Sequence, residues 1–149
     1  MALATPEAGL VIRYSYLWHS ESIKGQLEGI KDRPCAIVIT TRDVHNKSLV
    51  SVVPITHTKP SKLDEAIEIP QVTKTRLGLS NNPSERSWVI LSEINRFIWP
   101  GPDLRSITLN KTDVYDYGLL PPAFYDQLKS KLLEVIRKSR TSVVKRTTE

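Results

Sequence analysis

Residues 31–40 read KDRPCAIVIT and place three charged side chains before a proline and an apolar run. The continuous apolar stretch from Cys35 to Ile39 is typical of a strand that is buried on both faces. We therefore expect a strand from Cys35 to Thr40, with the charged side chain of Arg33 just before its first residue. A permanent cation in that position is either a solvated edge residue or a group aimed at an anion.

The next apolar run, LVSVVPIT at residues 49–56, predicts a neighbouring strand. Pro54 has no amide hydrogen, so it should end this strand or push it to the edge of the sheet. The segment 41–48 between the two runs reads as a turn. If the two strands are antiparallel neighbours, the start of one lies beside the end of the other. Arg33 and Thr56 should then face each other at one rim of the sheet.

The rest of the chain predicts short strands joined by irregular connections. Further strands are expected at residues 9–18, 66–70 and 88–99. Connections rich in polar residues, glycine or proline are expected at residues 19–32, 75–87 and 100–122. We place one domain at residues 9–140, between an N-terminal tail at 1–8 and a frayed C-terminal tail at 141–149.

The clearest helix runs from about Pro122 to Arg140. Five apolar residues at spacings of three and four form one stripe on it: Phe124, Leu128, Leu132, Val135 and Ile136. Many short strands with one terminal helix predict an α+β fold that is mainly β. We expect a small, strongly bent barrel or sandwich with the helix packed on it.

The composition is that of a globular protein with excess positive charge. Of the 149 residues, 40% are hydrophobic and 25% are charged, and the formal net charge is +5. This charge favours anionic partners, with nucleic acid the first candidate. Cys35 is the only cysteine, so an internal disulfide and a Cys-based zinc site are excluded, and its apolar neighbours indicate a buried, inert thiol. No apolar run approaches the roughly 18 residues of a membrane span, so we expect a cytoplasmic protein.

The predicted rim carries side chains that suit phosphate chemistry. Arg33 offers a planar fork of donors that matches two phosphate oxygens. Thr56 adds a neutral donor, and His57 can move a proton near neutral pH. RNA carries its own nucleophile, the 2′-hydroxyl, so donors that stabilise a pentacoordinate phosphorane could cleave it without a metal or cofactor. Trp18, at a strand end, is a candidate for stacking on a base.

Each of these residues also has an ordinary structural interpretation. An arginine at a strand edge is commonly a surface residue, and Asp32 is an obvious ion-pair partner for Arg33. Thr56 can be a turn hydroxyl bonded to its own backbone, His57 a solvent-exposed loop residue, and Trp18 a core residue. The sequence leaves both interpretations open.

Four segments follow one another in a recognisable order: Gly9 with an apolar strand, RPCAIVI, VSVVPIT, and LSEINRFIW with a terminal helix. This order resembles the MazF/PemK family, the toxins of bacterial type II toxin–antitoxin systems. The similarity covers most of the chain, from about residue 9 to residue 136. Its most specific pieces are Arg33-Pro34 at the head of one strand and Pro54-Ile55-Thr56 at the end of the next.

The resemblance implies an SH3-like small barrel of the MazF/CcdB type that acts as a homodimer. It implies a metal-independent, sequence-selective endoribonuclease that cuts single-stranded mRNA to 2′,3′-cyclic phosphate and 5′-hydroxyl ends, and that a cognate antitoxin protein neutralises. The family's catalytic Arg and Thr map onto Arg33 and Thr56, and His57 is the nearest proton-transfer candidate. Further RNA contacts are expected from Trp18, Glu28, Lys31, Pro54, Thr58 and Lys59.

Two segments depart from the family pattern. The loop at 19–32 is longer than usual, and Ser92-Glu93-Ile94 carries a carboxylate where the family usually has an amide. Such a carboxylate would repel RNA phosphate unless it points away from the groove. Two alternatives follow, both with the same fold: a CcdB-like toxin that acts on a protein target, and a non-catalytic member that binds nucleic acid or represses its own operon.

Overall fold

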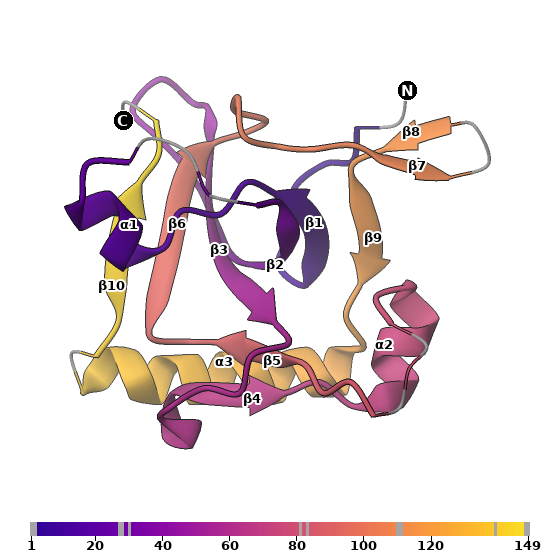
Figure 1. Cartoon of the computed structure of the whole chain (residues 1–149). Helices are drawn as coiled ribbons and strands as arrows, with labels where there is room; N and C mark the ends of the chain where they lie inside the picture. The colour runs from indigo at the N-terminus through magenta and orange to yellow at the C-terminus, as the bar shows by residue number, and fades with distance from the viewer. Residues whose placement is uncertain are drawn as a thin grey trace.

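The structure, a computed structural model, describes residues 3–26, 29, 31–80, 82, 84–109, 112–138 and 140–147. One mainly antiparallel sheet dominates it, and the long helix α3 (Pro122–Arg137) runs along the lower end of the sheet in Figure 1. The expected class is therefore confirmed: an α+β protein that is mainly β and has a C-terminal helix.

The main sheet is built from strands far apart in the sequence. Within the described residues these strands are β1 (Leu10–Tyr14), β2 (Arg33–Arg42), β3 (Ser48–Thr56), β4 (Ala66–Glu68), β5 (Trp88–Ile90), β6 (Glu93–Ile98), β9 (Asp116–Leu119) and β10 (Ser142–Lys145). The order β10-β6-β3-β2-β1-β9 is antiparallel except between β10 and β6. β5 pairs with the end of β3, and β4 pairs with β5. No ladder between described residues joins β9 to β10, so the sheet is open there.

The predicted hairpin of β2 and β3 is confirmed. The two strands are antiparallel neighbours in which Cys35 pairs with Pro54. Since pairing partners move in opposite directions along antiparallel strands, this register brings Arg33 and Thr56 to the same rim. At the other end of the hairpin, Asn46 adopts a left-handed conformation with a φ of 60°, which asparagine tolerates in turns.

Pro54 neither ends β3 nor places it at an edge, so that prediction is wrong. β3 lies inside the sheet, with β2 on one side and first β6, then β5, on the other. β6 pairs with Leu49 to Val52, whereas β5 pairs with Ile55 and Thr56. Pro54 lies at the change between these two neighbours, where a residue that cannot donate to the sheet is tolerated.

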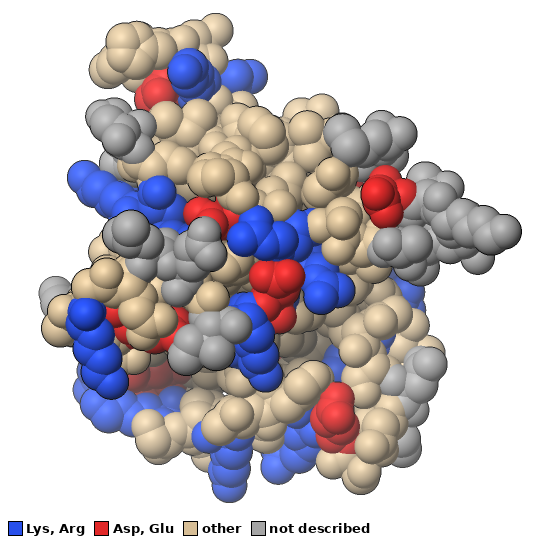
Figure 2. All heavy atoms as spheres, turned by 45° about the horizontal axis from the view of Figure 1, so that its top comes forward, with Lys and Arg blue, Asp and Glu red and all other residues tan. Residues whose placement is uncertain are grey.

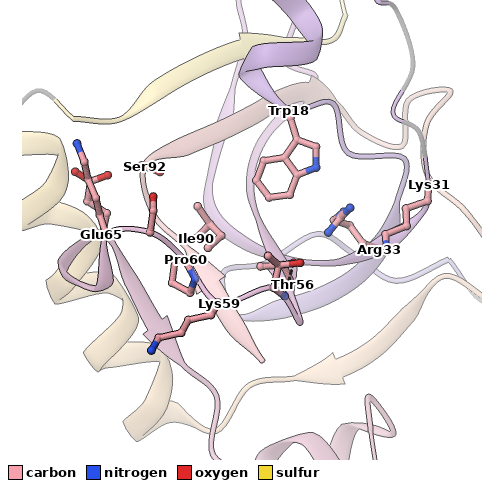
Figure 3. A pocket seen from close by; sticks show the side chains of 12 residues that line it. Trp18, Lys31, Arg33, Thr56, Lys59, Pro60, Glu65, Ile90 and Ser92 are labelled. Carbon is pink, nitrogen blue, oxygen red and sulfur yellow. Dashed lines mark hydrogen bonds between the residues drawn. The ribbon is translucent and has the colours of Figure 1, made fainter. Parts of the chain in front are cut away.

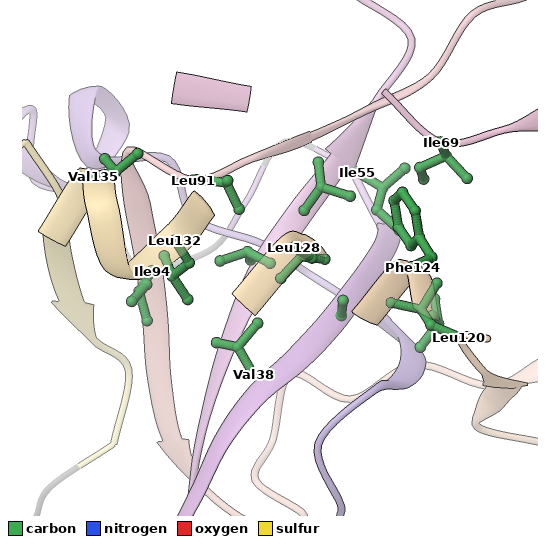
Figure 4. Close-up of a cluster of buried hydrophobic side chains, with 14 of the residues drawn as sticks. Val38, Ile55, Ile69, Leu91, Ile94, Leu120, Phe124, Leu128, Leu132 and Val135 are labelled. Carbon is green, nitrogen blue, oxygen red and sulfur yellow. The ribbon is translucent and has the colours of Figure 1, made fainter. Parts of the chain in front are cut away.

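The central strands are buried on both faces, as the apolar run of the second strand predicts. Successive side chains of a strand point to opposite faces. Val38 and Val53 belong to the core beneath α3, which Figure 4 shows. Ile37 and Phe97 belong to a second core on the other face. Cys35 is fully buried in this second core, and burial raises the pKa of its thiol, so the prediction of a buried, inert cysteine agrees with the structure.

The predicted apolar stripe holds α3 on the sheet. Four of its five members are buried, and each contributes about 1.5–3 kcal/mol through burial: Phe124, Leu128, Leu132 and Val135. Ile136, the fifth, keeps 38% of its surface exposed. Pro122 opens the helix, where the first amide has no intrahelical acceptor. The helix ends at Arg137, slightly before the predicted end.

Two predicted connections contain helices. The segment 19–32 begins with the short helix α1 (His19–Ile23), because the Glu21 carboxylate accepts a hydrogen bond from the Trp18 amide at 2.9 Å. The segment 75–87 begins inside α2 (Gln71–Leu77), which ends at the left-handed Gly78. Between β3 and β4, residues Leu63–Glu65 form one 3₁₀ turn, η1.

Two other segments are more ordered than predicted. The connection at 100–122 contains β9 and the hairpin of β7 (Ile107–Leu109) and β8 (Thr112–Val114). The prediction of a frayed tail is wrong over β10, which pairs with β6 and buries Val144. β9 and β10 each pair with a strand that is distant in sequence: β9 pairs with β1, and β10 pairs with β6. In the described part of the chain, no helix has the length and apolar character required to cross a bilayer.

Candidate functional site

One pocket of about 540 Å³ opens at the rim where β2 begins and β3 ends (Figure 3). Six of the residues selected from the sequence line it: Trp18, Lys31, Arg33, Thr56, Thr58 and Lys59. Six further residues complete the lining: Pro60, Ser61, Lys62, Glu65, Ile90 and Ser92. The prediction that Arg33 and Thr56 lie at the same rim is therefore confirmed, and both side chains line the pocket there.

Arg33 lies against the Trp18 ring, with its guanidinium carbon 5.0 Å from the ring centre. Its Nε is buried and has no hydrogen-bond partner among the described residues. The expected partner, Asp32, instead lies 3.9 Å from Nε of Arg13 and 3.5 Å from Nε of Arg105. A buried donor without an acceptor is costly, so the pocket holds a cation that an anionic ligand would stabilise.

Thr56 is the last residue of β3 and pairs with Trp88 of β5. Its hydroxyl oxygen accepts a hydrogen bond from the Thr58 amide at 3.1 Å, which is the turn interaction considered from the sequence. That bond uses a lone pair of the oxygen and leaves the hydroxyl hydrogen able to donate. Thr56 can therefore stabilise its turn and donate to a ligand in the pocket.

His57 is adjacent to Thr56 in sequence but does not line the pocket. Its Nδ1 lies 2.9 Å from the Ser87 hydroxyl, and its Nε2 lies 3.2 Å from a carboxylate oxygen of Glu85. Successive residues of an extended chain point in opposite directions, which explains why the imidazole leaves the site that Thr56 enters. A proton-transfer role for His57 stays a prediction.

Pro54 and Glu28 were also selected from the sequence. Pro54 is buried within β3 and does not line the pocket. Glu28 lies outside the described residues. Lys31 and Lys59 do line the pocket, and Figure 3 shows them on different sides of Thr56.

Glu93 points away from the pocket, although its neighbour Ser92 lines it. One carboxylate oxygen of Glu93 accepts hydrogen bonds from the His19 amide at 2.9 Å and from the Tyr16 hydroxyl at 3.2 Å. Burial raises the pKa of this carboxyl. The Glu93 carboxylate therefore accepts a hydrogen bond from the first residue of α1 and does not face the pocket.

The pocket gathers positive charge. Its described lining contains four basic residues, Lys31, Arg33, Lys59 and Lys62, and one acidic residue, Glu65. On the face shown in Figure 2, by contrast, basic and acidic side chains are interspersed. The pocket is thus suited to an anion, and the apolar surfaces of Trp18 and nearby lining residues are suited to a ring.

A buried polar cluster supports the segment that leads to Trp18. The Asn95 side chain donates to the Leu17 carbonyl at 2.8 Å and accepts from the Leu17 amide at 2.9 Å. Arg146 donates to the Ser15 carbonyl at 2.7 Å and lies 3.0 Å from a carboxylate oxygen of Asp103. Sequence reasoning missed this cluster because its members come from β6, the segment after β10 and two loops.

No protein-family model matches the chain, and no curated protein matches it. Within the described residues, no three His, Cys, Asp or Glu side chains gather as a set of metal ligands. The functional interpretation therefore depends on the residues that line the pocket.

Proposed function

We propose that this protein is a metal-independent endoribonuclease that cleaves single-stranded RNA, with Arg33 and Thr56 as its catalytic residues. The observation that carries the proposal is that both side chains line one pocket whose described lining is mainly basic. A phosphodiester in that pocket would bind the Arg33 guanidinium through its terminal N–H groups. The neighbouring Lys31 and Lys59 would attract the RNA backbone, whose charge dominates nucleic-acid affinity.

In the proposed reaction, the RNA 2′-oxygen bonds to the adjacent phosphorus and the bond from phosphorus to the 5′-oxygen breaks. The 2′-hydroxyl gives its proton to water, and the departing 5′-oxygen takes up a proton. The products are a 2′,3′-cyclic phosphate and a 5′-hydroxyl. Arg33 stabilises the charge of the phosphorane through its fork of donors, and the Thr56 hydroxyl donates to the same oxygens.

We further propose that the protein is a cytoplasmic toxin of the MazF/PemK type, a homodimer with an SH3-like barrel that a cognate antitoxin neutralises. The segments RPCAIVI and VSVVPIT support this interpretation because they supply the Arg33 and Thr56 positions. An irregularity in the β2–β3 register near Val38 supports the barrel, since bulges bend strands.

A second candidate function is RNA binding without cleavage. The observation that favours it is that no imidazole lines the described pocket, since His57 is engaged by Glu85 and Ser87. Such a protein would bind single-stranded RNA in a salt-dependent way and leave it intact.

The test is cleavage of end-labelled single-stranded RNA by the purified protein in excess EDTA. We expect fragments with cyclic phosphate ends, and a loss of at least 100-fold in rate for Arg33→Ala. Arg86→Ala is a matched control, because Arg86 also lies 5.0 Å from a tryptophan ring, that of Trp88, but outside the pocket. Intact RNA with salt-dependent binding would favour the second candidate. Full activity of folded Arg33→Ala would refute the site.

A further inference from the structure

The pocket extends beyond the proposed catalytic pair to a second end. Figure 3 shows Glu65 and Ser92 on one side of the cavity and Arg33 on the opposite side, with Ile90 and Pro60 between them. A cavity of about 540 Å³ falls in the range that encloses whole small organic ligands. A phosphate group at Arg33 would leave the Glu65 end open for another part of the ligand.

The Glu65 end differs in charge from the rest of the pocket. Glu65 is the one acidic residue in the described lining, and only 12% of its side chain is exposed. Nη1 of Arg140 lies 3.4 Å from Oε2 of Glu65, but it lies closer, at 2.9 Å, to the Asp64 carboxylate. No donor among the described residues contacts Oε1 of Glu65. This carboxylate repels phosphate and accepts hydrogen bonds only.

The backbone around Glu65 is held firmly. Its carbonyl accepts a hydrogen bond from the Leu91 amide at 2.9 Å, and its amide donates to the Lys62 carbonyl at 3.1 Å. The next residue, Ala66, pairs with Ile90 of β5. The pairing places the carboxylate near Ser92, so that acceptor oxygens and a hydroxyl donor share one end of the pocket.

We propose that the Glu65 end binds a guanine base of single-stranded RNA, an inference that rests on the proposed function of the pocket. Guanine presents two adjacent donors, N1–H and N2–H, which match the two oxygens of a carboxylate. Its O6 accepts hydrogen bonds, and Ser92 and Lys62 are donors at that end. Ile90 and Pro60 supply apolar contact to the ring.

The other bases fit less well. Adenine and cytosine each present one amino group beside a ring nitrogen that is an acceptor, and a carboxylate repels that nitrogen. Uracil presents one N–H between two carbonyl oxygens. Bases of single-stranded RNA expose these edges to the protein, so Glu65 becomes the residue that selects the base.

The test measures binding with RNA that cannot be cleaved. Fluorescein-labelled heptamers of 2′-fluoro uridine carry one central guanine, adenine, cytosine, uracil or hypoxanthine, and anisotropy gives the Kd at fixed salt. We expect the guanine heptamer to bind about tenfold more tightly than the others. Hypoxanthine, which lacks the N2 amino group, should lose most of this preference in the wild-type protein.

The variant Glu65→Gln should reduce the differences in Kd among the five heptamers, because the side-chain amide offers one acceptor oxygen where the carboxylate offers two. Glu68→Gln is the matched control, since Glu68 pairs with Arg86 outside the pocket. Equal affinities for all five heptamers, or a guanine preference that survives in folded Glu65→Gln, would overturn the inference. If the wild-type protein prefers guanine but leaves the unmodified guanine heptamer uncut, the nuclease proposal fails and the guanine site stands. The absence of any binding would reject both.

Discussion

The guanidinium of Arg33 lies 5.0 Å from the centre of the Trp18 ring, and its Nε has no acceptor among the described residues. One face of this cation is therefore covered by an aromatic ring, and one of its donors is buried without a partner. An anion that enters the pocket would therefore meet the guanidinium through its other N–H groups, on a cation that the Trp18 ring already holds in place.

Arg33→Lys keeps the charge but removes the planar fork and the stacking on Trp18. We expect the rate of RNA cleavage to fall about 100-fold, the usual effect of losing one donor to a developing anion. Stability should change by less than about 0.5 kcal/mol, because no hydrogen bond of Nε to the described protein is lost. Single-turnover cleavage and urea unfolding measure the two quantities. A lysine variant with wild-type activity would show that charge alone is sufficient.

Thr56→Val preserves the shape of the side chain and removes its hydroxyl. We expect cleavage to fall about 100-fold, because the donor to the phosphorane is lost. Thr56→Ser should recover cleavage to within about tenfold of the wild type, since it restores the hydroxyl. Both variants are compared in the same single-turnover assay, with circular dichroism as a check on folding. Equal activity of the valine and serine variants would assign Thr56 to the turn at Thr58 alone.

Arg146→Met should destabilise the fold by about 3 kcal/mol, because it leaves the Asp103 carboxylate buried without its ion-pair partner. The Arg146 side chain is only 2% exposed. Arg140→Met is the matched control: the Arg140 side chain is 44% exposed and pairs with Asp64, so its loss should cost less than about 1 kcal/mol. Urea unfolding followed by circular dichroism measures both. A similarly small loss of unfolding free energy in the two variants would contradict a structural role for Arg146.

Glu93 gives a prediction about pH. Burial raises the pKa of its carboxyl above the ordinary value of 4.5, so the folded protein binds this proton more tightly than the unfolded chain. The stability that Glu93 contributes is then fully present below pH 4.5 and is lost as the pH rises through the folded pKa. The unfolding free energy of the wild type minus that of Glu93→Gln should therefore fall as the pH rises above 4.5. A difference that rises with pH, measured by urea unfolding, would mean that the ionised carboxylate is the stabilised form.

The hairpin and the meeting of its two rim residues were predictable from sequence. A run of apolar residues, a turn and a second run define antiparallel neighbours, and antiparallel geometry alone brings Arg33 and Thr56 together. The helix α3 was equally predictable, since Phe124 and Leu128 belong to a stripe with helical period. These features depend on residues close in sequence or on one strong pattern.

The missed features depend on contacts between distant segments. Glu65 reaches the pocket because β4 pairs with β5, and the paired residues are at least twenty positions apart in sequence. β10 has no strong strand pattern of its own and is fixed by β6. His57 follows a predicted site residue, but its side chain leaves the pocket for Glu85. Local patterns carry no information about such pairings.

The hydrogen bond from Arg146 to the Ser15 carbonyl joins residues 131 positions apart in sequence. A ribosome makes Ser15 early and Arg146 late, so a nascent chain cannot secure the segment before Trp18 until residue 146 has emerged from the exit tunnel. The segment that leads to Trp18, which lines the pocket, is consequently completed only after Arg146 has been made. Synthesis itself thus delays the assembly of the binding pocket on each new molecule.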